Sequence, residues 1–391
     1  MSSIAVANAA VPARQLAVVL TSLGGLILLM GFAGAVAGVR QSLLAIIGFL
    51  AGLSLYHASF GFTAAWRRML NDRRSLGIRA QIIMLGVAIL AFFPLLGLGT
   101  MWGQSVSGFI NPVGVALVIG AFLFGIGMQL GGGCGSGTLF TVGGGSSRMV
   151  VTLVAFIAGS TVATADPLGW MGWPTIGSHS LVETAGWPLA LILAIALLAG
   201  AFFSPLSMER SRHGVEQPLF SPWHGNFLHG PWPLLAGALA LAAINIATLL
   251  VAGRPWGITA AFALWGAKFL ALIGTDVASW PYWRGDSALS APLLADATSV
   301  MNFGIMLGAL AAAGLAGKFA PARSIALPSL IAAVIGGLVM GIGARLATGC
   351  NIGAFFSGTA SGSLHGLVWL LFAIPGNAVG VRLRPLFKLD A

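Results

Sequence analysis

Two cysteines are the side chains of this sequence whose type and setting could do chemistry. Cys134 and Cys350 are its only cysteines, and each lies in a glycine-rich segment. When residues 125–140 are aligned with residues 341–356, 8 of 16 positions are identical and the cysteines coincide. A thiol is a soft, weak hydrogen-bond donor, and as a thiolate it is a nucleophile. The pair therefore indicates either transient binding of a soft, sulfur-containing ligand or transfer of sulfur through a persulfide.

Two other interpretations of these cysteines stay open from the sequence. Free cysteine is among the most buried residue types, so both thiols could simply be small buried side chains. They could also pair in a disulfide. Neither belongs to a Cys/His cluster with the spacing of a metal site, so we expect no metal and no other cofactor.

A second, shorter motif also occurs twice. Residues 60–66 and 256–262 both read aromatic-Gly-x-Thr-Ala-Ala-aromatic, and each copy precedes one of the cysteine segments. The chain is therefore predicted to contain an internal duplication, which is typical of transporters.

The elements that hold these motifs must be membrane helices. Of the 391 residues, 58% are hydrophobic and only 7% are charged, whereas soluble proteins carry about 25% charged residues. Apolar runs long enough to cross the bilayer recur along the whole chain. The sequence thus predicts an all-α polytopic membrane protein surrounded by lipid. The net charge of +10 is explained by Lys and Arg in cytoplasmic loops, so no nucleic-acid partner is expected.

The distribution of charge predicts that the two halves are inverted. The basic loop after residues 60–66 is expected in the cytoplasm, and the acidic segments 166–187 and 275–300 outside. If both short motifs are re-entrant, nine crossings remain, with the N-terminus outside and the C-terminus in the cytoplasm. That count places Arg40 on the cytoplasmic side.

Four parts of the chain follow from this scheme. Residues 1–40 would form an N-terminal transmembrane helix, and residues 41–187 the first repeat half with the Cys134 loop. Residues 188–252 would hold connecting helices and a cytoplasmic loop. Residues 253–391 would form the second, inverted half with the Cys350 loop.

The paired cysteine motifs, together with residues 60–67 and 256–259, resemble the YeeE/YedE family of bacterial inner-membrane proteins. The resemblance covers residues 45–380 and implies uptake of thiosulfate or a related sulfur compound. It also implies nine helices with four inward loops in an hourglass shape, cysteines along a central path, and delivery of sulfur to a cytosolic carrier of the TusA type. Family importers place a third cysteine where this chain has Gly61, so the sulfur species carried stays open.

Glycine-rich segments at membrane depth favour loops between half-helices, whose N-terminal amides would bind the hard, oxygen-bearing end of an anion. Arg345 would serve the path or reach the external headgroups. The predicted path residues are Cys134, Cys350, Gly61, Gly133, Gly135, Gly137, Gly349, Gly353, Gly257, Thr63, Thr259 and Arg345.

Three functions are compatible with this pattern. The first is import of a sulfur-containing anion such as thiosulfate, and the second is transport of another small solute, such as a selenium compound or another oxyanion. The third is a membrane sulfurtransferase, which would need a positive charge near a cysteine, and Arg345 is the one intramembrane candidate. No nucleotide-binding motif or mid-helix carboxylate suggests an energy source.

Overall fold

The computed structural model describes residues 15–220, 223, 226–322 and 324–389. Within them, ten helical stretches are long and apolar enough to cross a membrane. The prediction of an all-α polytopic membrane protein is confirmed. Two short antiparallel strand pairs, β1 (Thr100–Met101) with β2 (Gln104–Ser105) and β3 (Pro112–Gly114) with β4 (Thr175–Ser178), lie in loops.

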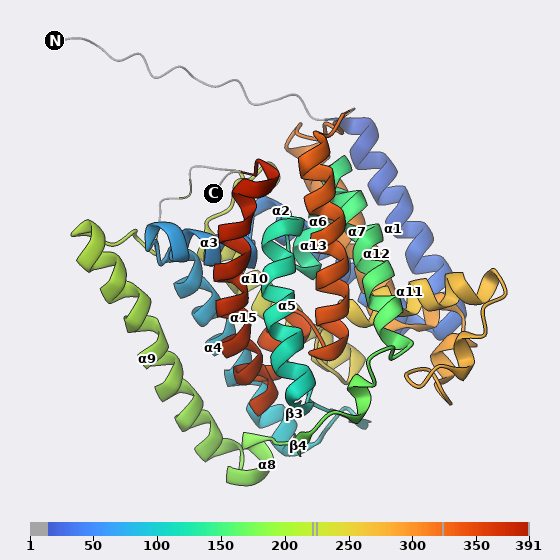
Figure 1. Ribbon diagram of the computed structural model, residues 1–391, viewed down its shortest axis with the longest axis horizontal. Coiled ribbons are helices and arrows are strands. Elements are labelled where there is room, and N and C mark those ends of the chain that lie inside the picture. The colour runs from blue at the N-terminus through green and yellow to red at the C-terminus, as the bar shows by residue number, and fades with distance from the viewer. Residues whose placement is uncertain (1–14, 221–222, 224–225, 323, 390–391) are drawn as a thin grey trace.

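Long helices make up most of the bundle in Figure 1. They are α1 (Leu16–Ala37), α2 (Val39–His57), α4 (Leu76–Leu98), α5 (Val115–Gly131), α7 (Ser147–Thr164), α9 (Trp187–His213), α10 (Leu234–Ala252), α12 (Ala297–Leu315), α13 (Leu327–Leu346) and α15 (Leu364–Leu383).

Shorter helical segments interrupt this series. They are α3 (Phe62–Asp72), α6 (Gly135–Gly143), α8 (Leu181–Ala185), α11 (Thr259–Leu272), α14 (Gly358–Ala360), the π-helical η5 (Asn351–Ser357) and the 3₁₀ turns η1 (Trp170–Gly172), η2 (Val277–Ser279), η3 (Ser287–Leu289), η4 (Leu293–Ala295) and η6 (Arg384–Phe387).

The start of α1 and the end of α15 lie at the same end of the bundle (Figure 1). The Gln15 side chain exchanges two hydrogen bonds of 3.0 Å with the backbone of Phe319, in the segment after α12. Arg40, at the start of α2, instead lies near Gly253 at the opposite end. Sequence reasoning had placed Arg40 on the same side as the segment after α12, so that expectation is wrong.

The reason is the count of crossings around the first short motif. The expectation of about nine crossings takes the whole apolar run that ends in this motif, residues 43–65, as re-entrant. In the structure that run is α2, a complete helix of 19 residues, followed by the separate half-helix α3. Because α2 is a full crossing, α1 must begin at the end of the bundle where α2 ends, which is also the end with the basic α3–α4 turn. Residues 1–14 themselves lie outside the described residues.

Two series of helices run in opposite directions. The N–H of Trp232, before α10, donates to the His57 carbonyl at the end of α2. The other end of α10, at Gly253, meets Arg40 at the start of α2, so α2 and α10 are antiparallel. Each is followed by a half-helix, α3 or α11, and then by three long helices, which are α4, α5 and α7 or α12, α13 and α15; α9 connects the two series. This is the inverted order expected for the two repeats, while the boundaries at residues 40, 187 and 252 stay a prediction.

Glycines allow the long helices of the two series to pack at backbone distance. A Cβ added to Gly308 of α12 would lie 1.9 Å from the Phe49 carbonyl oxygen of α2, and one added to Gly52 of α2 would lie 2.0 Å from the Ile305 oxygen. α13 likewise packs against α5 and α7. In contrast, α1 and α9 flank the bundle and are mostly exposed to the surroundings.

We expect Gly308→Ala to destabilise the protein by about 1–3 kcal/mol or more, because the new methyl group forces α2 and α12 apart. Thermal unfolding in detergent measures this. Gly24→Ala is the matched control, because a Cβ there meets nothing within 4 Å and alanine favours the helix. An unfolding temperature for Gly308→Ala equal to that of the control would contradict the packing described.

Candidate functional site

The two cysteine loops meet in the centre of the protein. Cys134 and Cys350 are 1% and 0% exposed, and both are free thiols, so they do not form a disulfide. A Cβ built on Gly135 would lie 3.2 Å from the Cys350 sulfur. The thiol of the second half therefore rests against the first residue of α6, which follows the cysteine of the first half.

Each cysteine occupies the position just before the N-terminus of a short helix. Cys134 precedes α6, and Cys350 precedes η5. The first amides of a helix lack intrahelical partners and carry partial positive charge. The first amides of α6 directly follow Cys134, those of η5 directly follow Cys350, and the Cys134 sulfur lies 3.4 Å from the Ser136 hydroxyl. Soft sulfur atoms and oriented N–H donors are thus next to each other in both loops.

The backbone of both loops requires glycine. Gly132 has φ +92°, and Gly349 has φ +151°. A Cβ on Gly133 would lie 3.1 Å from the backbone of Gly137, and one on Gly349 would lie 2.7 Å from the amide nitrogen of Ala354. These contacts explain why Gly133 and Gly349 immediately precede the cysteines.

Side chains hold the ends of the helices that enter these loops. The Arg148 guanidinium donates to the carbonyls of Leu130 and Gly131, at 2.8 and 2.7 Å. In the second half, the His365 Nε2 lies 2.9 Å from the Ala347 carbonyl. Such partners are needed because non-helical backbone at membrane depth has no bulk water to bind.

The residue five positions before each cysteine contacts the threonine of the short motif in its own half. The Gln129 Nε2 donates to the Thr63 carbonyl at 3.2 Å, and the Arg345 Nη2 donates to the Thr259 hydroxyl at 3.0 Å. Arg345 is only 5% exposed, and it also donates to the Tyr282 hydroxyl at 3.0 Å. Arg345 is therefore buried beside Thr259, and its place on the path stays a prediction.

Several polar atoms around the cysteines are buried without a hydrogen-bond partner among the described residues. They are Thr63 Oγ1, Thr138 Oγ1, Arg345 Nε and both side-chain polar atoms of Asn351. A buried polar group left unpaired costs about 1–3 kcal/mol, so a concentration of them indicates a place for a polar ligand or ordered water.

The glycines of the two short motifs line cavities at opposite ends of the bundle. Gly61 lines a cavity of about 90 Å³ together with Arg68 and Arg74. Gly257 lines a cavity of about 10 Å³ together with Arg254. Gly257 also lies beside Gly353 of the second cysteine loop, since a Cβ on Gly353 would be 3.9 Å from its Cα.

An aromatic ring that was not predicted from the sequence lies against Gly257, one of the residues that line the smaller cavity. A Cβ on Gly257 would lie 3.4 Å from the Phe109 ring, and the Phe109 amide donates to the Ser361 hydroxyl at 3.0 Å. Tyr282 and Arg254 were missed as well. Phe109 and Tyr282 lie in loops far from either repeated motif, and no spacing in the sequence connects them to the cysteines.

Comparisons with known proteins identify the family of this chain. Residues 57–379 match the family described as "Sulphur transport". The thiosulfate transporter TsuA of Spirochaeta thermophila is 26% identical over 358 residues, which are 85% of this chain and 95% of that protein. TsuA of Escherichia coli is 25% identical over 346 residues, with 85% and 91% covered. YedE of Escherichia coli, named a probable transporter, is 30% identical over 160 residues, 40% of each chain. The family match spans both cysteine loops and both short motifs, and the chain therefore belongs to the sulphur transport family, as the resemblance to YeeE/YedE proteins predicted.

Proposed function

We propose that the protein imports a small sulfur-containing anion, with thiosulfate as the leading substrate, along a path formed by Cys350 and Cys134. The observation that carries the proposal is the contact of the Cys350 thiol with Gly135, at the N-terminus of α6. It puts two soft sulfur groups and two helix N-termini at one place. Two relatives that cover most of the chain are named thiosulfate transporters.

The chemistry of thiosulfate suits this place. Its terminal sulfur is soft and polarizable, and its other end bears hard oxygens. A thiol offers weak S–H contacts to the former, and the amides after each cysteine offer hydrogen bonds to the latter. Transport requires binding that is strong enough for the ion to enter and weak enough for it to leave. Weak thiol contacts at two successive positions meet both conditions.

The proposed route begins at the Gly257 cavity, passes Cys350 and Cys134, and ends at the Gly61 cavity. Related importers, by the resemblance noted above, carry a thiol where this chain has Gly61. Here that position contributes open space lined by arginine, so the last step would rely on charge instead of a third thiol. A cytosolic sulfur carrier of the TusA type is the proposed recipient.

We propose that the protein lies in a bacterial inner membrane, with the basic end of the bundle in the cytoplasm. Most described basic residues gather at this end, in the α3–α4 turn, at the end of α9 and after α15. Both the start of α1 and the end of α15 would then face the cytoplasm, since they lie at the same end. This replaces the expectation of an external N-terminus.

Reporter fusions test this orientation. A cytoplasm-active reporter fused before α1 and one fused after α15 should both be active, whereas one inserted at Gly177, in the loop between α7 and α9, should be silent. A silent fusion before α1 would restore the expectation of ends on opposite sides.

Replacing either cysteine tests the proposed function. Cys134→Ala and Cys350→Ala should each lower uptake of labelled thiosulfate about tenfold or more, the equivalent of losing about 1.4 kcal/mol of interaction. The assay uses cells that lack other importers, with protein amounts matched in the membrane. Unlabelled selenite, sulfite and sulfate as competitors identify the substrate class. Wild-type uptake in both variants would refute the role of the thiols.

Two neighbouring glycines give a sharper test of the path. In Gly135→Ala the new methyl group would lie 3.2 Å from the Cys350 sulfur and 3.3 Å from the Thr259 methyl, which is tighter than ordinary contact. We expect uptake to fall about tenfold. That change corresponds to about 1.4 kcal/mol, which lies within the cost of about 1–3 kcal/mol for overpacking.

Gly137→Ala is the matched control for that variant. It lies in the same short helix, and its Cβ would be 3.6 Å from the Cys134 sulfur, an ordinary contact. Because alanine also favours the helix, this variant should fold and transport at near the wild-type rate. Equal uptake by the two variants would show that the contact between Gly135 and Cys350 is not on the path.

A further inference from the structure

The cavity at Gly61 is bounded by four separate parts of the chain, one of which is the start of α10 at Leu234. Gly61 and Arg68 come from the beginning and middle of α3, and Arg74 from the turn into α4. Gln217 contributes from the segment that follows α9. The cavity of about 90 Å³ is large enough for about three water molecules, since each water takes about 30 Å³ in the liquid.

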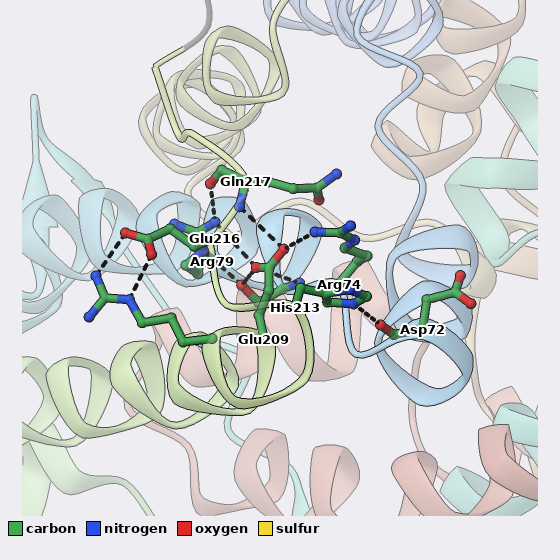
Figure 2. Close-up of polar contacts among 9 residues, drawn as sticks. Asp72, Arg74, Arg79, Glu209, His213, Glu216 and Gln217 are labelled. Carbon is green, nitrogen blue, oxygen red and sulfur yellow. Dashed lines mark hydrogen bonds and ion pairs between the residues drawn. The ribbon is translucent and has the colours of Figure 1, made fainter.

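Arg74 and Gln217, which line this cavity, also belong to a buried ionic cluster around Glu209, near the end of α9 (Figure 2). The carboxylate is fully buried and lies 3.3 Å from the Arg74 guanidinium and 3.6 Å from that of Arg79. The Ser75 hydroxyl and amide and the Gln217 amide also donate to it. The cluster therefore fixes the α3–α4 turn and the segment after α9 against each other, and Arg74 belongs to both the cluster and the cavity.

Positive charge exceeds negative charge around the cavity. Arg68, Arg74 and Arg79 are opposed by the single carboxylate of Glu209. Two other acids lie nearby but are directed elsewhere. The Asp72 carboxylate points away from the cluster in Figure 2. Glu216 pairs with Arg210 at 2.7 Å, and that guanidinium holds the pKa of Glu216 at about 2.

The inner side of α3 connects this cavity to the cysteine loops. The Thr63 carbonyl accepts from Gln129, which precedes the Cys134 loop on α5. The Phe62 ring packs edge-on against Phe355, five residues after Cys350. A half-helix only 11 residues long thus separates the buried thiols from a cavity with surplus positive charge.

We propose that this cavity is the site from which a small divalent oxyanion is released to the cytoplasm, bound by Arg68 and Arg74. Guanidinium groups form paired, charge-assisted hydrogen bonds with oxyanions, and so suit an anion with several oxygens. Glu209 competes with the anion for Arg74, which keeps the affinity low enough for the anion to leave. This inference rests on the proposed function, because it takes the anion to arrive from the cysteines.

Transport measured separately from each side of the membrane tests the proposal. In inside-out vesicles thiosulfate reaches the Gly61 cavity first, and in right-side-out vesicles it reaches the opposite end first. Arg68→Gln leaves the Glu209 cluster intact, so the protein should still fold. We expect the half-saturating thiosulfate concentration to rise about tenfold in inside-out vesicles and to change less than twofold in right-side-out vesicles.

Arg73→Gln is the matched control. It removes the same charge from the residue directly before Arg74, and its side chain, exposed like that of Arg68, does not line the cavity. It should leave both half-saturating concentrations unchanged. Arg68→Lys should restore part of the cytoplasmic-side affinity, because it keeps the charge. If Arg68→Gln acts equally from both sides or from neither, or if Arg73→Gln has the same effect, the proposed release site is wrong.

Binding of inorganic sulfate to the purified protein separates this inference from the proposed function. Titration calorimetry should show binding to the wild type that weakens about tenfold in Arg68→Gln. If wild-type vesicles carry no thiosulfate in either orientation but sulfate binding depends on Arg68, the proposed function fails and the anion site stands. Sulfate binding that is the same in both proteins would overturn the site.

Discussion

The structure depends on satisfying polar, non-helical backbone deep inside a membrane protein. Both cysteine loops interrupt a helix, and each interruption exposes carbonyls on one side and amides on the other. The protein satisfies the carbonyls with side chains, Arg148 in one half and His365 in the other. The amides on the other side directly follow the cysteines at the centre. The amides that folding leaves without helical partners are thus the donors that the proposed site would use.

The two halves of the protein are inverted, so the two cysteine loops are reached from opposite ends of the bundle. Because α2 and α10 are antiparallel, the half-helices that follow them approach the centre from opposite ends of the bundle. Each carries a glycine and a threonine at its beginning, and each opens onto a cavity that contains arginine. The two cavities differ in size, about 90 Å³ against about 10 Å³, and the Phe109 ring lies against Gly257 at the smaller one. The same motif therefore forms a wider end and a narrower end of one proposed route.

Much of this arrangement was predictable from the sequence because the segments that form it occur twice as recognisable motifs. The fold class follows from the apolar runs, and the matched register of the two glycine-rich segments pairs Cys350, whose sulfur lies beside Gly135, with Cys134 of the other half. The crossing count failed because periodicity does not show where one apolar run ends in a full helix and a half-helix begins. Phe109 and Tyr282 were not predictable, since loop side chains reach the site through tertiary packing alone.

The central claim is that Cys350 and the N-terminus of α6 form one binding place for a sulfur-containing anion. The most direct measurement is an experimental density map of the protein with thiosulfate bound. Our account predicts the anion between the Cys350 sulfur and Gly135, with its oxygens toward the amides after the cysteines. Thiosulfate bound only at the surface of the bundle, with the two loops unoccupied at saturating concentration, would contradict it.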